Sequence, residues 1–194
     1  MPTIKREWYP GASYHVTTRG NHRNDIFRDK DDFVYYLSFM KDAVDYYSYD
    51  KYEIICYCLM DNHVHILIKT AEKPLGQFIG RISSKYAKYY NKKYNYIGHL
   101  FQDRYFSTII QSDTQMLETS KYIHLNPVRA NMVEKPENYE WSSYSMYIGI
   151  EAENLICSRY LLSYFNSRKL YKKYVELIDI KEEIGATAKC ATGV

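Results

Sequence analysis

Apolar and polar positions along the chain follow two different periods. Residues 12–18 alternate one by one, and two apolar runs at 52–60 and 63–68 are separated only by an Asp-Asn pair. Short alternation is typical of a half-buried strand, and two strand-like runs with a two-residue Asx linker indicate a hairpin. Residues 104–111 form another strand-like segment. The sequence therefore predicts four strands.

Three further segments show the helical spacing of three and four residues. Residues 29–49 open with acidic residues and place apolar side chains on one face, and residues 74–94 begin with a proline and repeat that spacing. Ser112 and Gln115 match a capping box, which predicts the start of a third helix. Because proline disfavours helical geometry in the residue before it, we expect this helix to stop near Pro127.

The order of these elements predicts the fold class. It is strand, helix, two strands, helix, strand and helix, which favours an α+β protein. We expect a ferredoxin-like β-α-β-β-α-β antiparallel sheet with helices on one face, an added helix and a C-terminal extension. Residues 1–150 would form the main domain, and residues 151–194 a helical extension with a loose tail. Within these, residues 134–150 are expected to be irregular, and residues 155–183 to hold one or two short helices.

The composition excludes several classes of protein. The chain has 194 residues, of which 46% are apolar and 25% charged, values that rule out disorder and low-complexity fibres. No apolar stretch reaches the ~18 residues of a membrane span, and the first residues lack the apolar core of a signal peptide. The four cysteines do not resemble a secreted disulfide framework. We therefore expect a cytoplasmic protein without a membrane span.

The charge distribution is more informative than the net charge of +3. Residues 73–102 carry six basic residues and no acidic one. Four of these cations follow the predicted second helix at spacings of four, three and four: Arg81, Lys85, Lys88 and Lys92. Such a stripe is either a solvated helix face or a surface for a phosphate backbone. The chain also contains 23 tyrosines, which suit wet, polar-partner surfaces as well as a core.

His63 and His65 lie two residues apart in a predicted strand, so both imidazoles point to one face and can reach one cation. Two histidines that only satisfy hydrogen bonds are the simpler alternative. Cys56 and Cys58 precede them and raise a zinc alternative. Two cysteines two apart on a strand are too far apart to share a tetrahedral zinc comfortably, and both lie in an apolar run, so zinc is disfavoured.

The predicted third helix carries Tyr122 and Asn126, which are four residues apart and share a face. A tyrosine hydroxyl can act as a nucleophile, and an amide oxygen is an acceptable ligand for a hard cation. Packing is the alternative role for a tyrosine in so tyrosine-rich a chain. We expect the remaining histidines His15, His99 and His124 to be structural and hydrogen-bonded within the fold.

Five segments together carry a family resemblance. They are YHVTTRGN at 14–21, MDNHVHIL at 60–67, GHLFQDRY at 98–105, YIHLNPVRA at 122–130 and WSSY at 141–144. In this order they resemble the single-tyrosine transposases of the HUH class, and most closely the REP-associated tyrosine transposases. The resemblance covers about residues 10–150. Asp61 departs from the family pattern, which usually has proline there; this alters a turn and should spare the chemistry.

The resemblance implies a metal-dependent endonuclease and strand transferase that acts on single-stranded DNA with hairpin ends. It implies that His63, His65 and Asn126 hold Mg²⁺ or Mn²⁺, and that Tyr122 attacks the scissile phosphate to form a 5′-phosphotyrosine. No nucleotide cofactor is needed, and the chain has no phosphate-binding loop of the G-x-x-x-x-G-K-[ST] type. The protein would be associated with the nucleoid when bound to DNA. Its state, monomer or homodimer, stays open.

The residues expected to contact DNA come from three parts of the chain. They are Arg19, Arg23, Arg81, Lys85, Lys88, Lys92 and Arg104. Two alternatives to the transposase are retained: a related HUH nickase of replication or plasmid transfer, and a non-catalytic ferredoxin-like module that binds single-stranded nucleic acid. The second alternative leaves His63, His65 and Tyr122 without a common explanation.

Overall fold

A four-stranded antiparallel sheet forms the centre of the computed structural model, which describes residues 8–177. The strands are β1 (Ser13–Arg19), β2 (Glu53–Met60), β3 (His63–Lys69) and β4 (Phe106–Ile109). Their spatial order is β2-β3-β1-β4, and every pairing is antiparallel. This is the ferredoxin-like sheet that the sequence predicts, with the β2–β3 hairpin turning at the Asp-Asn pair.

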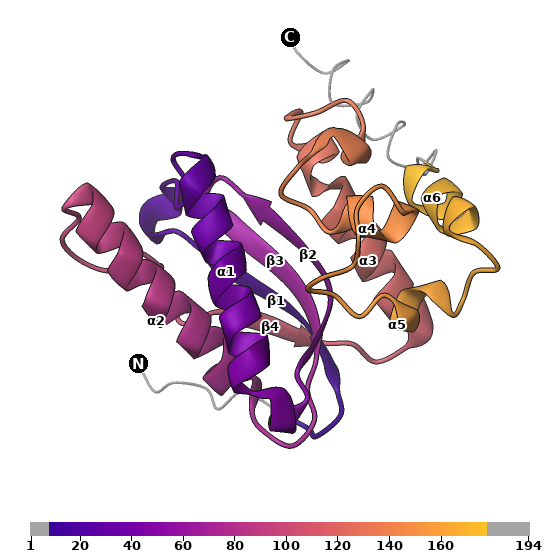
Figure 1. Cartoon of the computed structure of the whole chain (residues 1–194), viewed down its shortest axis with the longest axis horizontal. Helices are drawn as coiled ribbons and strands as arrows, with labels where there is room; N and C mark the ends of the chain where they lie inside the picture. The colour runs from indigo at the N-terminus through magenta and orange to yellow at the C-terminus, as the bar shows by residue number, and fades with distance from the viewer. Residues whose placement is uncertain (1–7, 178–194) are drawn as a thin grey trace, which may run out of the picture.

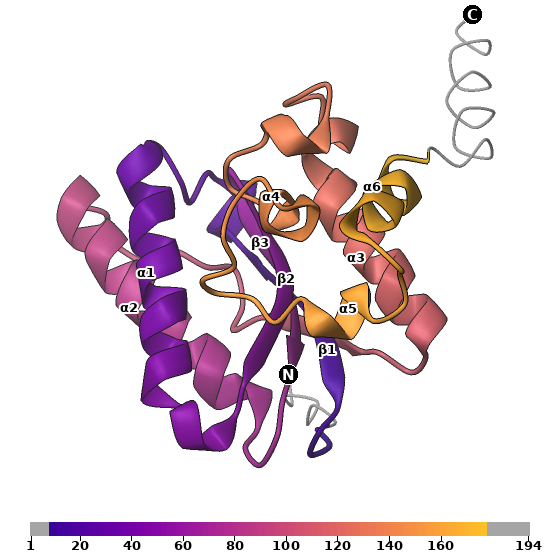
Figure 2. The ribbon, with the colours of Figure 1, turned by 45° about the vertical axis from the view of Figure 1, so that its right-hand side comes forward.

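Helices cover both faces of the sheet (Figures 1 and 2). On one face lie α1 (Lys30–Tyr46) and α2 (Leu75–Tyr94). The other face carries α3 (Asp113–Arg129), α4 (Tyr144–Ile148), α5 (Arg159–Leu162) and α6 (Arg168–Glu176). Short 3-10 turns occupy Asn21–Arg23, Ser48–Asp50 and Pro136–Asn138. None of the helices in residues 8–177 is both long and apolar enough to span a membrane.

Strand alternation divides the buried side chains between two cores. Val64, Ile66 and Ile68 of β3 pack toward α1 and α2, while Leu67 joins a second core with α3, α4 and α6. His63, His65 and Leu67 follow one another at every second position of β3 and so point to the same face of the sheet. The two histidines therefore lie on the face that α3 covers. The sheet thus presents both histidines to the helix that carries Tyr122.

Helix α3 begins at the predicted cap but ends later than the sequence predicts. The Ser112 side chain accepts a hydrogen bond from the Gln115 N–H at 3.1 Å, which confirms the predicted cap. The Gln115 side chain accepts from the Gln111 N–H rather than from Ser112 itself. The helix was expected to stop near Pro127, but it contains Pro127 and continues to Arg129. Proline removes a single N–H donor there, and the Ala130 N–H still closes the last turn onto Asn126.

The segment after α3 is more ordered than expected. Residues 134–150 include α4, and Ser142 forms a bridge to Cys58 of β2, so the WSSY motif is attached to the edge of the sheet. Trp141 stacks on Phe33 of α1 with ring centroids 4.6 Å apart. Of the one or two short helices expected within 155–183, two are present, α5 and α6. The division of the chain at residue 150 stays a prediction, and the expected loose tail lies outside the described residues.

Candidate active site

The candidate site is built on β1 and β3, which pair along their whole length. The register places Thr17 opposite His65 and Arg19 opposite His63. Directly opposed residues of antiparallel strands point to the same face, so the four side chains converge below α3. The prediction that His63 and His65 share a face is confirmed by this register.

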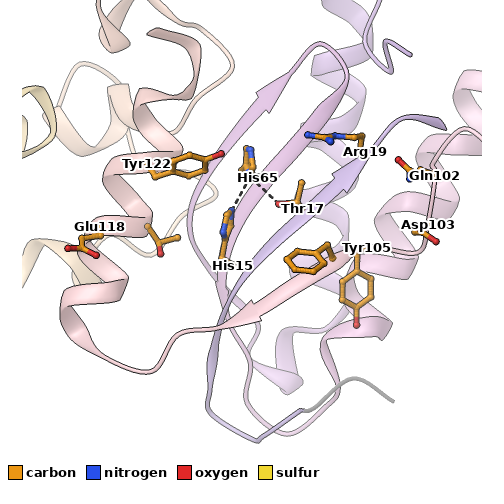
Figure 3. Close-up of a pocket in the computed structure, with 11 residues that line it drawn as sticks. His15, Thr17, Arg19, His65, Gln102, Asp103, Tyr105, Glu118 and Tyr122 are labelled. Carbon is orange, nitrogen blue, oxygen red and sulfur yellow. Dashed lines mark hydrogen bonds between the residues drawn. The ribbon is translucent and has the colours of Figure 1, made fainter. Parts of the chain in front are cut away.

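The two ring nitrogens of His65 have different surroundings. Its Nδ1 lies 2.9 Å from Nε2 of His15 and 3.1 Å from Oγ1 of Thr17, as Figure 3 shows. Its Nε2 is buried and has no hydrogen-bond partner among the described residues. Buried polar atoms are nearly always satisfied, so an orphaned imidazole nitrogen beside a cavity calls for a ligand.

His63 repeats this arrangement at the end of β3. Its Nδ1 lies 2.6 Å from the amide oxygen of Asn62, to which it donates a hydrogen bond. The His63 and His65 rings are nearly perpendicular, with centroids 4.8 Å apart. In both histidines Nδ1 is engaged, which leaves Nε2 as the free nitrogen.

Burial keeps this group of histidines neutral. Burial, and to a smaller extent the positive charge of nearby Arg19, lowers the pKa of His63 to about 4. The pKa of His65 is held well below its ordinary value by burial and by the neighbouring His63, His15 and Arg19. Burial also lowers the pKa of His15. Neutral imidazoles are the form that can bind a metal ion, and burial favours this form for all three histidines near pH 7.

Tyr122 projects from α3 over the histidines (Figure 3). Its ring meets those of His65 and His15 edge-on, with centroids 5.5 Å and 6.0 Å away. The Arg129 guanidinium lies 5.3 Å from the ring centroid on the same helix. The side chain is 40% exposed. The hydroxyl is therefore close to the paired histidines and open to a substrate.

Asn126 lies one turn after Tyr122 and is buried. Its Nδ2 donates a hydrogen bond to the Tyr122 carbonyl at 3.0 Å. This bond fixes the amide. The amide oxygen is left without a hydrogen-bond donor among the described residues.

A cavity of about 640 Å³ opens beside these residues. Its walls include His15, Thr17 and His65 from the sheet, and Glu118, Thr119 and Tyr122 from α3. The opposite side is formed by Arg19, Gln102, Asp103, Tyr105 and Phe106 (Figure 3). His63 and Asn126 lie outside this lining.

The described residues contain no group of three His, Cys, Asp or Glu side chains placed to hold a metal. The set of His63, His65 and Asn126 does not count among such groups, because its third donor is an amide oxygen. Cys56 and Cys58 are buried with free thiols in the core under α3, and burial raises the pKa of both. They behave as core residues.

The predicted DNA-contacting cations occupy different environments. Arg81 and Lys85 both bind Asp42 of α1, at 3.0 Å and 2.9 Å. Five others form no ion pair with any residue in the described part of the chain: Arg19, Arg23, Lys88, Lys92 and Arg104. The stripe on α2 is thus divided between an ion-paired half facing α1 and a half open to solvent.

The three histidines expected to be structural have different surroundings, and the sequence did not identify the residues that support His63 and His65. His124 is hydrogen-bonded inside the fold, as predicted. His15 is also hydrogen-bonded, but to His65 itself, and exposed His99 has no side-chain hydrogen bond within residues 8–177. Two signals were available: His15 and Thr17 share a face of the predicted first strand, and Asn62 directly precedes His63.

Comparison with known proteins identifies the class. The fold and the family match together define a transposase of the single-tyrosine type, an enzyme that cuts and joins DNA strands. The chain belongs to the IS200-like transposase family, whose sequence model matches residues 9–126. The matched region includes the sheet, both histidines and Tyr122.

Two relatives refine this comparison. A Haemophilus influenzae protein assigned as a REP-associated tyrosine transposase is 24% identical over 157 residues, which are 74% of this chain and 86% of that protein. A solved structure of a REP-associated tyrosine transposase bound to a REP hairpin superposes with a TM-score of 0.65 at 13% identity. The superposition covers 81% of this chain and 94% of that one. It shows that the two proteins share a fold.

Proposed function

We propose that the protein cleaves and rejoins single-stranded DNA next to a hairpin through a covalent 5′-phosphotyrosine on Tyr122. The observation that carries this proposal is the position of the Tyr122 ring, 5.5 Å from the ring of a histidine whose Nε2 is buried without a partner. A nucleophile and a nearby cation site are the two parts that metal-assisted phosphodiester transfer needs. The solved structural neighbour is bound to a REP hairpin, which supports a hairpin substrate.

The residues around the proposed cation site fit a divalent metal. His63 and His65 would bind it through Nε2, because Asn62, His15 and Thr17 already engage both Nδ1 atoms. Asn126 would supply an amide oxygen. A bound Mg²⁺ or Mn²⁺ would polarise the scissile phosphate and offset charge in the transition state. Two nitrogen donors and one amide oxygen suit either ion.

The proposed reaction conserves the phosphodiester energy. The Tyr122 oxygen loses its proton and bonds to phosphorus, the bond from phosphorus to the 3′-oxygen breaks, and that oxygen takes up a proton as a free 3′-hydroxyl. A second 3′-hydroxyl can then attack the phosphotyrosine and restore the tyrosine. Because one ester replaces another in each step, no nucleotide triphosphate is consumed. Arg19 lines the cavity beside Tyr122, which supports a role for it in binding the DNA phosphates around the nucleophile.

A cleavage assay on labelled single-stranded hairpins with unpaired flanks tests the proposal, with Mn²⁺ or with a chelator. We expect metal-dependent cleavage by the wild type, and a loss of about 100-fold or more in His63→Ala, a larger loss than that for second-sphere residues. Hairpin binding should be retained in this variant, because His63 is half-buried at the end of a strand. Equal cleavage by His63→Ala, or cleavage in the chelator, would contradict the metal site. Binding without cleavage under all conditions would favour the non-catalytic module.

A further inference from the structure

A second groove runs along α2 and is continuous with the catalytic cavity. It has a volume of about 870 Å³ and lies between α2 and residues 98–105. Gln102, Asp103 and Tyr105 line both the groove and the cavity, so the two hollows meet at these three residues. Figure 3 shows this junction on the side of the cavity away from α3. A strand whose phosphate is held beside Tyr122 can continue into the groove.

Two glycines of α2 lie along the groove. Gly76 and Gly80 lie inside α2, where glycine weakens a helix relative to alanine. A Cβ on Gly76 would approach the Tyr105 hydroxyl to 3.3 Å, so packing accounts for that glycine. A Cβ on Gly80 would meet no atom within 4 Å. Packing within the described chain therefore does not account for Gly80, whereas a ligand lying close to the helix backbone would.

Two polar atoms along the same groove lack partners. Ser83 Oγ and Asn91 Oδ1 are buried atoms without a hydrogen bond among the described residues, and both residues line the groove. Asn91 does use its Nδ2, which donates to the Gly98 carbonyl at 3.3 Å. Leaving such atoms unpaired is unfavourable, so the groove favours a ligand with hydrogen-bonding edges.

The charges around the groove favour an anionic ligand. Lys88 and Arg104 line it and form no ion pair with a described residue, whereas Asp103 contributes one negative charge at the junction with the cavity. Phe101 and Tyr105 supply aromatic surface in the same wall. Cations beside aromatic rings in a groove are the arrangement that binds unpaired nucleic acid, with phosphates on the cations and bases on the rings.

We propose that this groove holds the unpaired DNA strand adjoining the scissile phosphate, with bases lying over Gly80 and phosphates facing Lys88 and Arg104. This inference rests on the proposed function, because it takes the strand at Tyr122 to be single-stranded DNA. It assigns the unpaired flank of the substrate to α2, while the cleavage chemistry stays on α3 and the sheet.

The test measures DNA binding without cleavage, so its failure is distinct from failure of the proposed chemistry. The probe is a fluorescent (dT)12 strand in a chelating buffer, read by anisotropy, with a blunt hairpin as a second probe. Gly80→Leu and Ser84→Leu fill the groove from exposed helix positions, and Ser38→Leu, at an exposed position of α1 outside the groove, is the matched control. Thermal melting checks that all three variants fold, which is expected because leucine is a good helix former.

We expect Gly80→Leu and Ser84→Leu each to weaken (dT)12 binding about tenfold, the effect of losing one stacked base. Ser38→Leu should bind like the wild type, and the blunt hairpin should bind equally to all variants. Unchanged (dT)12 binding by the folded Gly80→Leu and Ser84→Leu variants would overturn the proposal. So would a wild type that does not bind (dT)12, or an equal loss in Ser38→Leu.

Discussion

At the scale of single residues, the site depends on which nitrogen of each histidine is already occupied. Hydrogen bonds from Nδ1 orient the ring and increase the basicity of Nε2, and loss of such a partner typically lowers metal affinity about 10–100-fold. His65 has two of these partners, His15 and Thr17, and His63 has Asn62. The three partners come from β1 and the hairpin turn. We propose that they orient both rings before a cation binds.

The role of His15 can be tested by a substitution that preserves its shape. In His15→Phe the ring still packs beside His65 and Tyr122, but the partner of the His65 Nδ1 is lost. We expect Mn²⁺ affinity to fall about 10–100-fold, the range for second-sphere partners of metal-binding histidines. Titration followed by electron paramagnetic resonance measures this directly. His22→Asn is the control, because His22 is exposed and its positive φ of 54° suits asparagine. Unchanged affinity in His15→Phe would contradict the assignment.

At the scale of elements, the position of Tyr122 depends on how α3 is fixed to the sheet. His124 points to the opposite side of α3 from the cavity, is fully buried, and lies 3.1 Å from the Ser143 hydroxyl and 3.0 Å from the Tyr171 hydroxyl. Burial lowers the pKa of His124 to about 3, so it is neutral and needs partners for both nitrogens. This network joins α3 to α6 and to the WSSY segment. The C-terminal helices therefore contribute to placing Tyr122.

Removing one hydroxyl from this network should destabilise the fold. Tyr171→Phe leaves the His124 Nδ1 without its partner in a buried place, which is expected to lower the free energy of unfolding by about 1–3 kcal/mol. Chemical denaturation measures the change. Tyr49→Phe serves as the matched control, because Tyr49 is 94% exposed and should show no effect. Equal stability of the two variants would show that the network does not anchor α3.

Most elements were predictable because their patterns are local. The strand alternation, the Asp-Asn hairpin and the Ser112 cap each depend on residues within a few positions, and each is confirmed. The end of α3 was not predictable, since a proline near a C-terminus removes only one hydrogen bond and the helix continues past it. Helix α4 was missed because its packing on β2 comes from contacts with residues far away in the sequence.

At the scale of the whole molecule, the site joins segments that no local pattern relates. His15, His65 and Tyr122 come from β1, β3 and α3, and they meet only because the sheet order places β1 beside β3 with α3 across both. The sequence indicated His63, His65 and Tyr122 through the family resemblance, but not His15 as the partner of His65. The ion pairs of Arg81 and Lys85 with Asp42 were also hidden, because they depend on how α1 and α2 pack.

One chain supplies both the tyrosine and the histidines of the proposed site. We therefore expect cleavage in cis, whatever the oligomeric state. A mixture of Tyr122→Phe and His63→Ala proteins should remain inactive, because neither chain contains a complete site. The mixture is assayed after incubation long enough for subunits to exchange, with an equal amount of wild type as the reference. Recovery of a substantial part of wild-type cleavage would instead indicate that the tyrosine helix acts on the partner's histidines.

The most direct measurement of the central claim is the covalent adduct itself. End-labelled single-stranded hairpin DNA is incubated with Mn²⁺ and the wild type, Tyr122→Phe or Tyr49→Phe, and the products are separated on a denaturing gel. The account predicts a protein-linked labelled band for the wild type and Tyr49→Phe, dependent on the metal, and no band for Tyr122→Phe. Peptide mapping of the wild-type adduct should place the nucleotide on Tyr122. A metal-dependent band that persists in Tyr122→Phe would show that another tyrosine is the nucleophile and would contradict the account.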